Sequence, residues 1–548
     1  MSVFIGYPSF MAYQMMKGKK GNNDGFPSIP GMIARYSALG LTNEQMATNP
    51  VWVDKTGNGH DLQMKNFAWK EGSGISDVYP GFILGDGVDD FAVTEKELNF
   101  EDTYTVYTAF IPFQNNPTKN MMMAGKDIKD FYMNYSSLNA LSYYSGNKAV
   151  VINLSNGFNL LCCKRDADNM TIKNLITGDS VTATANEFIN NPGLYYLWRV
   201  ANGYSYARLA IAGQTICNGY FSTDEDDEKV FDWYKKQYPW LFFDQAWTVT
   251  GKTNEDEDRA TIANITGNDN DLVLSNFGFA EGSGYGLYAQ NYISYAITNR
   301  AVYTKTNSSI HVTKSITAGV NFTESARDVT IPSYRIKVTG IQSGQEMIYR
   351  GSNNTFLTNI PSDGIYVLPA VEKGSNLGFQ FVSYTGDCDI TIEQIPEYEG
   401  YLITDGVDDK VQSSSFTMNE DWTIVGDWEL LSNVQINCGI VKAQNVCLYN
   451  TANGLLISIN NPRSLQSFGT KSLHAICSDG RLYDRNWVEY EYTVDQNFEI
   501  VESSLNIGFN LNNYTQIAFK NLGIYNDQIL SKDDCIKAYN YLQTLKAK

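Results

Sequence analysis

The sequence predicts an all-β protein with two similar β-sandwiches, a further β-sandwich inserted into the second, and an N-terminal arm. Three observations predict this fold class. Aromatic residues and glycine are abundant, with 36 Tyr, 27 Phe and 44 Gly. Alternating apolar runs are broken by Asn, Gly and Asp clusters about every ten residues, as in antiparallel sandwiches. A long internal repeat is present, and 548 residues exceed what one core holds, so roughly three or four domains are expected.

The internal repeat sets the domain organisation. Gly40–Gly74 reads GLTNEQMATNPVWVDKTGNGHDLQMKNFAWKEGSG, and Gly251–Gly284 reads GKTNEDEDRATIANITGNDNDLVLSNFGFAEGSG. The segment DGVDD occurs at Asp86–Asp90 and again at Asp405–Asp409. A repeat of this length means that one structural unit was used twice.

The first unit is predicted over residues 31–240. The segments PGFILGDG and DFAVTEKEL flank the DGVDD turn, while TYTVYTAFIP, KAVVINL and LYYLWRV alternate as sandwich strands do. The unit closes with a helix, because Thr223 and Asp226 form a capping-box pattern ahead of apolar residues spaced by three and four.

The second unit is predicted to be split, over residues 241–284 and 398–548. Gly74 and Asp86 are 12 positions apart, whereas the equivalent Gly284 and Asp405 are 121 apart. The difference is the size of a small domain, and insertion is tolerated in a surface loop. The inserted residues 285–397 carry about eight short strand patterns and no helix, which predicts a third β-sandwich. A closing helix is predicted after Ser531.

Residues 1–30 differ from the rest and are predicted to be an arm that anchors the protein to a partner. They contain a basic KGKK cluster and a GNNDG segment. Their apolar residues are too many for a solvated tail, and methionine packs adaptably into irregular grooves. The predicted anchoring residues are Phe4, Tyr7, Phe10, Met11, Met15 and Met16.

The composition narrows the function classes. A net charge of −19 disfavours binding to nucleic acid or to anionic membranes. The chain has no apolar run of about 18 residues and no signal-peptide pattern, so we expect no membrane span and folding in a cytoplasm. Its eight cysteines show no metal-ligand spacing, which favours reduced, partly buried thiols.

The two DGVDD segments are predicted to be turns, because Asp side chains bond nearby backbone and Gly supplies positive φ. Three carboxylates in five residues could also gather a calcium ion, although an EF-hand loop needs more ligands at defined offsets. The turn with a solvated acidic face is favoured, and no cofactor is expected. The candidate ligands are Asp86, Asp89, Asp90, Asp405, Asp408 and Asp409.

No catalytic constellation is predicted. Glu489 and Glu491 share a face of one strand at a separation that a glycosidase pair could use, but a charged solvent face accounts better for them. The three histidines, His60, His311 and His474, lie near no nucleophile motif. The chain is therefore predicted not to be an enzyme.

The repeated motifs resemble the LamG-like (laminin G3-type) branch of the concanavalin A-like lectin superfamily. Asp54, Thr56–Gly59 and Leu62 match its D-x-S-G-N-G-x-x-G-x-L element, and Asp86–Phe91 match its F-D-G-V-D-D-Y element. In the closing segment Ile524, Tyr525 and Asn526 match, together with Leu530, Ser531 and Asp534. The second unit departs from the pattern, since Asn264 replaces Asp54 and Asp269 replaces Gly59. The resemblance implies a jelly-roll lectin fold in both units.

Duplicated and interrupted modules of this kind also resemble virion proteins of tailed phages, crAss-like phages among them. The resemblance implies a non-enzymatic structural protein, a head fibre or a capsid or tail decoration, at the virion surface after assembly in the host cytoplasm. Its partners would be other virion proteins, bound through the arm, and host or mucus glycans, and a homodimer or homotrimer is expected. The alternatives are a bacterial lectin-like adhesion protein and a polysaccharide depolymerase. Sugar rings stack on exposed aromatics, and the candidate glycan contacts are Trp52, Trp69, Tyr143 and Tyr144.

Overall fold

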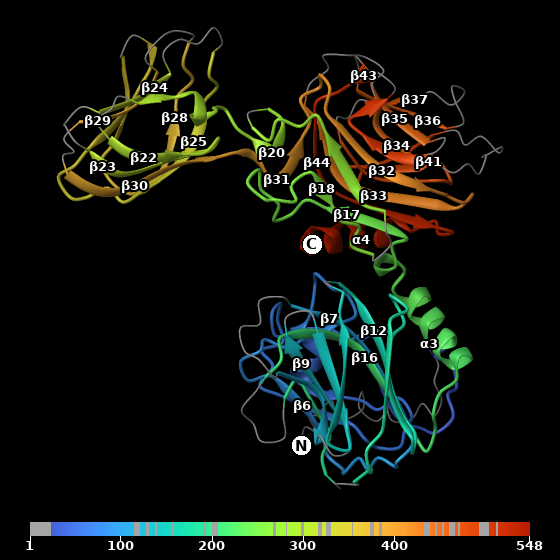
Figure 1. The fold of residues 1–548 in the computed structure, drawn as a ribbon. Coiled ribbons are helices and arrows are strands. Elements are labelled where there is room, and N and C mark those ends of the chain that lie inside the picture. Colours follow the sequence, from blue (N-terminus) through green and yellow to red (C-terminus); the bar gives the residue numbers. More distant parts are fainter. Residues whose placement is uncertain are drawn as a thin grey trace, which may run out of the picture. The chain divides into compact units, whose positions relative to one another are not determined.

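The computed structural model describes most of the chain and confirms the all-β class (Figure 1). It divides into two compact units. Unit 1 comprises residues 1–244, 265–268 and 530–545, and unit 2 comprises residues 245–264, 269–529 and 546–548. The described residues are 24–113, 121–127, 131–137, 140–155, 157–189, 193–199, 206–266, 270–280, 282–297, 301–315, 320–324, 330–352, 355–372, 377–382, 386–431, 439–443, 446–451, 454–459, 466–468, 472–492, 503–510 and 513–547.

The sandwich of unit 1 consists of two eight-stranded antiparallel sheets. The first has the order β14-β13-β12-β7-β16-β5-β4, with β1 also pairing β16. Its strands are β14 (Ser180–Thr184), β13 (Asn169–Asn174), β12 (Asn159–Arg165), β7 (Tyr104–Pro112), β16 (Leu209–Asn218), β5 (Ile83–Leu84), β4 (Gly74–Ile75) and β1 (Met32–Ser37).

The second sheet of unit 1 has the order β11-β10-β9-β8-β15-β6-β3-β2. Its strands are β11 (Lys148–Asn153), β10 (Ala140–Ser145), β9 (Phe131–Ser137), β8 (Met121–Asp127), β15 (Tyr196–Leu197), β6 (Phe91–Thr94), β3 (Leu62–Lys65) and β2 (Val51–Trp52). We call this the β9 sheet. The core lies between the two sheets, because alternate residues of each strand point inward. It includes Tyr104, Val106 and Phe110 of β7 and Phe131 and Met133 of β9.

The helix α3 (Asp224–Gln237) lies on the outer face of the first sheet, where its Asp227 contacts Tyr107 of β7 and Lys164 of β12. It is the predicted closing helix, with the Thr223–Asp226 capping box in place. The 3₁₀ turn η1 (Pro239–Leu241) follows it, and α4 (Lys532–Thr544) packs in the same unit, where Tyr541 stacks on Phe243 at 5.9 Å between ring centroids. A short helix, α2 (Asn43–Thr48), begins at a Thr42 capping box that the sequence analysis did not use.

The end of the predicted arm belongs to the sandwich. The Asp24 carboxylate pairs with the guanidinium of Arg35, and Phe26 packs edge-on against Trp233 at 5.0 Å. Trp233 also donates a hydrogen bond to the Asp24 carbonyl. The predicted anchoring residues Phe4, Tyr7, Phe10, Met11, Met15 and Met16 lie outside the described residues.

Unit 2 contains a second pair of eight-stranded sheets with a separate core. One has the order β20-β31-β44-β33-β38-β39-β40 with β17 beside β44, and the other has the order β18-β19-β32-β41-β34-β35-β36-β37. The strands of the first are β20 (Gly284–Leu287), β31 (Glu397–Ile403), β44 (Ile517–Asn526), β33 (Trp422–Leu430), β38 (Leu473–Cys477), β39 (Arg481–Asp484), β40 (Glu489–Glu491) and β17 (Gln245–Thr248). Those of the second are β18 (Thr261–Ile262), β19 (Leu272–Ser275), β32 (Lys410–Phe416), β41 (Ser503–Ile507), β34 (Gly439–Ala443), β35 (Val446–Thr451), β36 (Gly454–Ile459) and β37 (Gln466–Phe468); β42 (Phe509–Asn510) pairs β43 (Asn513–Tyr514) separately.

The inserted residues of unit 2 form two five-stranded sheets around their own core. The orders are β21-β24-β29-β26-β27 and β22-β23-β30-β25-β28. The structure adds one 3₁₀ turn, η2 (Tyr292–Ser294), to a segment predicted to have no helix. The strands are β21 (Ala296–Ile297), β24 (Val320–Glu324), β29 (Leu377–Phe381), β26 (Met347–Arg350), β27 (Phe356–Ile360), β22 (Ala301–Lys305), β23 (Ser309–Ser315), β30 (Gly386–Ile395), β25 (Tyr334–Thr339) and β28 (Gly364–Leu368).

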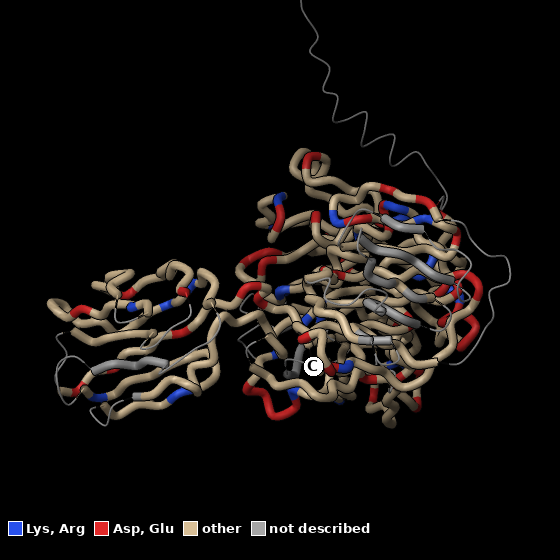
Figure 2. Tube along the Cα trace, turned by 90° about the horizontal axis from the view of Figure 1, so that it is seen from above, with Lys and Arg blue, Asp and Glu red and all other residues tan. Residues whose placement is uncertain are grey.

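Charge and hydropathy are distributed as in a globular protein. Acidic residues occur in every part of the described chain and do not gather in one (Figure 2). None of the described helices is long and apolar enough to cross a membrane.

Candidate functional site

The repeated DGVDD segments form two matching turns, one in each unit. In the first, an Oδ1 of Asp86 accepts the Val88 N–H at 2.7 Å, and an oxygen of Asp90 accepts the Asp86 N–H at 2.9 Å. In the second, Asp405 accepts the Val407 N–H at 2.7 Å and Asp409 accepts the Asp405 N–H at 2.7 Å. The aspartates thus close both turns by bonding their own backbone, as the sequence predicts.

Each turn is held by a neighbouring segment of the repeat. The Asn66 amide donates to the Asp89 carbonyl at 3.0 Å, and the Asn276 amide donates to the Asp408 carbonyl at 3.0 Å. Both asparagines adopt positive φ, 68° and 70°, a conformation that Asn tolerates better than most residues. The side chain of Ser283 completes the second turn by donating to Asp409 at 3.0 Å.

A second asparagine pair fixes an edge strand in each unit. The Asn43 side chain accepts the Ile75 N–H and donates to its carbonyl, at 2.7 and 2.8 Å. Asn254 does the same for Tyr285, at 2.7 and 3.3 Å. The glycine before each strand residue is required, because a Cβ on Gly74 or Gly284 would lie 2.4 Å from the Asn oxygen. The two copies therefore agree down to individual hydrogen bonds.

Burial makes the last aspartate of each turn a weak acid. Both residues are buried: Asp90 is 0% exposed and Asp409 is 1% exposed. Desolvation raises the pKa of the Asp90 carboxyl to about 6 and that of Asp409 to about 7, and the neighbouring aspartates add to the rise. Both carboxyls therefore change protonation near neutral pH.

Some of the candidate ligand oxygens already accept backbone N–H groups, whereas Asp90 Oδ1 is buried without a hydrogen-bond partner. Asp86, Asp89 and Asp90 offer ligand oxygens within 4.8 Å of one another, and Asp405, Asp408 and Asp409 do the same. The oxygens that accept backbone N–H groups have little capacity left for the six to eight oxygen contacts that calcium takes. Because both copies keep the pattern, it serves the shared fold.

The predicted glycan contacts separate into buried and accessible rings. Trp52 and Tyr143 lie in the core, 1% and 0% exposed, and Tyr143 donates a hydrogen bond to the Tyr104 hydroxyl at 2.7 Å. Their rings are therefore not available to a sugar. Trp69 is partly exposed and stacks on Phe67 at 5.2 Å, and Tyr144 is partly exposed on the outer face of the β9 sheet.

Tyr144 belongs to a row of residues that crosses the outer face of the β9 sheet. It pairs with Tyr132 of β9, Tyr132 pairs with Gly125 of β8, and Gly125 pairs with Tyr196 of β15. Directly paired residues of antiparallel strands point to the same face, and all three tyrosines are partly exposed. We call Tyr144, Tyr132, Gly125 and Tyr196 the tyrosine row.

Gly125 separates the tyrosine row into two parts. Tyr144 and Tyr132 meet edge to face at 5.6 Å, whereas Tyr196 lies two strands from Tyr132, about 10 Å away. No side chain stands between them at Gly125, and glycine is required there because a Cβ would lie 2.4 Å from the Phe131 carbonyl oxygen.

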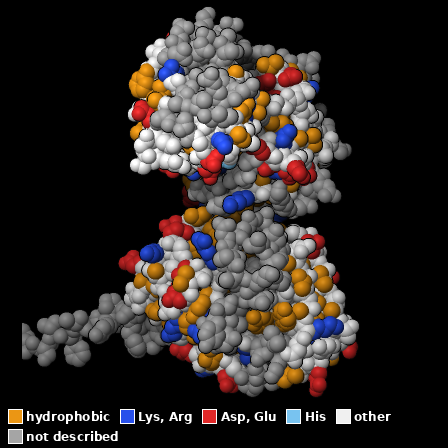
Figure 3. Space-filling view, turned by 60° about the vertical axis from the view of Figure 1, so that its left-hand side comes forward, with side chains coloured by type: hydrophobic (Ala, Val, Ile, Leu, Met, Phe, Trp, Pro, Cys, Tyr) orange, Lys and Arg blue, Asp and Glu red, His pale blue; other side chains and the backbone are white. Residues whose placement is uncertain are grey.

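An arginine stands at the Tyr196 end of the row. The Arg199 guanidinium lies over the Phe91 ring at 4.3 Å and within 5.9 Å of the ring centroids of both Tyr196 and Tyr206. We call Arg199, Phe91, Tyr196 and Tyr206 the Arg199 cluster. Figure 3, in which the side of the molecule that carries β6 and β9 in Figure 1 comes forward, shows hydrophobic side chains in small groups beside charged ones. None of Tyr132, Tyr196 and Arg199 was predicted from the sequence.

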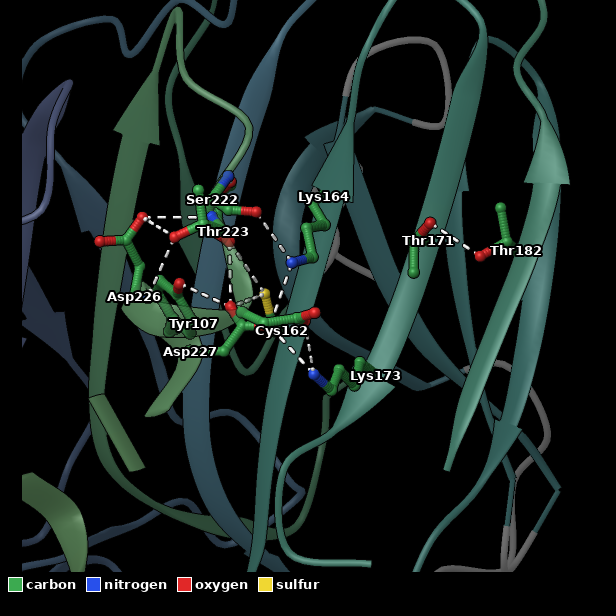
Figure 4. A network of polar contacts seen from close by, with 12 residues as sticks. Tyr107, Cys162, Lys164, Thr171, Lys173, Thr182, Ser222, Thr223, Asp226 and Asp227 are labelled. Atoms are coloured by element: carbon green, nitrogen blue, oxygen red, sulfur yellow. Dashed lines mark hydrogen bonds and ion pairs between the residues drawn. The ribbon is translucent and has the colours of Figure 1, made fainter. Parts of the chain in front are cut away.

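A buried polar network under α3 is structural (Figure 4). Asp227 accepts hydrogen bonds from Tyr107 and Ser222, at 2.8 and 3.0 Å, and pairs with Lys164 at 3.0 Å. Burial and the Asp227 charge raise the pKa of the Cys162 thiol well above its usual range, so this cysteine is a poor nucleophile. The network fixes the start of α3 to the outer face of β7 and β12.

The remaining sequence candidates do not assemble a catalytic centre among the described residues. Glu489 and Glu491 lie on β40, the last strand of its sheet, and both are exposed. His311 pairs with the exposed Asp389 at 2.7 Å, while His474 is buried and its pKa is lowered by that burial.

The comparisons with known proteins found distant structural similarity. No protein-family model and no curated protein sequence matches the chain. Among solved structures, the sialidase of Trypanosoma rangeli is 12% identical with a TM-score of 0.30, over 43% of this chain and 40% of the sialidase. The botulinum neurotoxin type G receptor-binding domain is 12% identical with a TM-score of 0.27, over 70% of this chain and 85% of that domain. Domain 4 of an extracellular arabinanase from Geobacillus stearothermophilus, in complex with arabinotriose, is 14% identical with a TM-score of 0.25, over 38% and 99%. These scores are too low to carry an argument about function.

Proposed function

We propose that the protein is a non-enzymatic glycan-binding protein on the exterior of a tailed-phage virion, where it serves as a head fibre or as a capsid or tail decoration. The tyrosine row is the observation that carries the binding part of this proposal. Three partly exposed rings on one sheet face, two of them about 10 Å apart across a glycine, suit the faces of sugars in an extended chain.

The internal repeat supports a functional role for this face. Where both copies agree, as in the acidic turns, the residues serve the fold. After DGVDD the first copy has Phe91, a member of the Arg199 cluster, whereas the second copy has Lys410. The fold therefore does not require an aromatic residue at this position.

A structural role fits better than catalysis. Glycosidases need a raised-pKa carboxylic acid and a second carboxylate on opposite sides of a bound sugar. The exposed pair Glu489 and Glu491 lies side by side on one strand in unit 2, and the tyrosine row lies in unit 1. The virion location rests on the sequence resemblance, the apolar N-terminal segment and the acidic composition.

A glycan array tests the binding part. We expect weak binding of the purified chain to a subset of extended glycans. We expect Tyr132→Ala to reduce it about tenfold, since contacts of one aromatic ring contribute about 0.5–1.5 kcal/mol beyond its buried area and tenfold corresponds to about 1.4 kcal/mol. Tyr303→Ala, which removes a partly exposed tyrosine of the insert, is the control and should bind as the wild type does. Equal loss in both variants, or no loss in either, would contradict a role for the tyrosine row.

Mass spectrometry of purified particles tests the virion part. The protein should be present in stoichiometric amounts after the particles are banded in a density gradient. Its absence from particles, together with its presence at a bacterial surface, would favour the alternative of a lectin-like adhesion protein. Release of reducing ends from a bound polysaccharide would favour a depolymerase.

A further inference from the structure

We propose that the ligand of the tyrosine row is an anionic glycan, and that the Arg199 cluster binds its oxyanion group. The inference rests on the proposed glycan binding and specifies its chemistry. In this arrangement the sugar chain lies across Tyr144, Tyr132 and Tyr196, and a carboxylate or phosphate group of one sugar faces Arg199.

The first argument is the way Arg199 is held. Its guanidinium carbon lies over the Phe91 ring, 4.3 Å from the centroid, a cation–π contact that holds the charged group beside the tyrosines. Tyr196 and Tyr206 flank it at 5.9 Å. The side chain is therefore oriented before any ligand arrives, which lowers the entropy cost of binding.

The second argument is the absence of an internal partner. Within the described part of the chain, the Arg199 side chain forms no ion pair and no hydrogen bond, and its Nε is buried without an acceptor. Arg35 and Arg481 each pair with an aspartate, whereas Arg165 and Arg350 resemble Arg199 in having buried guanidinium nitrogens without an acceptor. The Nε is closed to a ligand, so the donors that an oxyanion would meet are the Nη groups, which no described residue uses.

The third argument is position. Tyr196 belongs both to the tyrosine row and to the Arg199 cluster, so the cation lies at the end of the stacking surface. Arginine binds carboxylates and phosphates in a two-pronged geometry, and partial burial strengthens such a pair relative to one in water. A neutral sugar chain would not provide an anionic group for the Arg199 guanidinium.

The test measures binding to acidic polysaccharides and to their neutral counterparts. The probes are polygalacturonate, alginate and polysialic acid, the carboxyl-reduced form of each, and a phosphomannan with its dephosphorylated form. We expect at least one acidic polymer to bind about tenfold or more tightly than its neutral form. A preference for the phosphomannan alone would identify phosphate as the anionic group.

Variants locate the preference. Arg199→Ala should reduce the preference for the acidic form to less than about twofold, and Arg199→Lys should retain part of it, because lysine keeps the charge but not the fork of donors. Arg208→Ala is the control, since Arg208 is an exposed arginine of the same unit whose guanidinium lies over Phe113, 5.6 Å from the ring centroid. Thermal melts verify that each variant folds. If Arg199→Ala does not fold, the comparison of acidic and neutral polysaccharides with the wild-type protein still tests the inference.

The outcomes separate this inference from the proposed function. Equal binding of acidic and neutral forms by the wild type overturns the inference and leaves glycan binding intact. A preference that survives Arg199→Ala also overturns it. Binding to no glycan of the array or of this set overturns both.

Discussion

At the scale of single residues, the two buried aspartates predict a pH dependence of stability. The pKa values of Asp90 and Asp409 rise to about 6 and 7 in the folded state, whereas an unfolded aspartate titrates near 3.9. A raised folded-state pKa means that the folded protein binds the proton more tightly. The stabilisation is fully present below the unfolded pKa and is lost as the pH rises through about 6 to 7.

Asp90→Asn should remove this dependence in unit 1, because an amide keeps an oxygen for the Asp86 N–H and carries no charge. We expect the variant to exceed the wild type by on the order of 1 kcal/mol at pH 8 and to match it near pH 4. Melting curves across this pH range measure the difference. Asp89→Asn, at an exposed position of the same turn, is the control, and an equal pH profile for both variants would contradict the assignment.

The exposure of a single side chain cannot be predicted from the sequence when it depends on which face of the sheet the residue occupies. Tyr143 and Tyr144 are neighbours in β10, yet the first is buried in the core and the second lies in the tyrosine row. A strand alternates sides, so one residue of register decides which ring meets solvent. The sequence shows that alternation exists, but the register comes from pairing with β9 and β11. Trp52 was placed among exposed rings for the same reason.

At the scale of elements, the paired asparagines that hold the edge strands predict unequal costs. Asn254 is buried and makes both bonds to Tyr285, whereas Asn43 is more accessible. Replacing Asn254 by Ala should destabilise unit 2 by about 1–3 kcal/mol, because it leaves a backbone N–H and a carbonyl of β20 without partners. Asn43→Ala should cost less, since water can replace the side chain. Chemical denaturation compares the two, and a larger loss for Asn43→Ala would contradict this account.

The acidic turns give a second prediction at this scale. Because their aspartate oxygens already accept backbone N–H groups, millimolar calcium or a chelator should shift the melting temperature by less than about 1 °C. A larger rise that saturates with calcium and disappears in Asp86→Asn would instead establish a metal site.

Helix starts and single strands could be predicted from the sequence, because the residues that determine them are neighbours in the chain. The caps of α3 and α4 follow from Thr223–Asp226 and Ser531–Asp534, and strand patterns of the insert such as YRIKVT reappear as β25. The tyrosine row was not predictable, because β15 pairs with both β6 and β8 from far along the chain. Nothing in the spacing of Tyr132 and Tyr196 indicates that they lie on one sheet face.

At the scale of the whole molecule, the net charge of −19 and the Arg199 cluster act in opposite directions on an acidic ligand. Long-range repulsion slows the approach of an anionic polymer, whereas the local contact holds it. Single sites of this kind bind weakly, and useful adhesion then requires many copies on one particle. The proposed function therefore includes an assembly partner, and the N-terminal residues are the proposed attachment.

Two truncations separate attachment from folding. The contacts of Asp24 with Arg35 and of Phe26 with Trp233 show that the sandwich begins before residue 30. Deleting residues 1–23 should leave the melting temperature unchanged and abolish incorporation into particles. Deleting residues 1–30 should also lower the melting temperature, because it leaves the 2% exposed side chain of Arg35 without its carboxylate. Calorimetry and mass spectrometry of particles measure the two effects, and normal incorporation of the shorter deletion would show that attachment lies elsewhere in the chain.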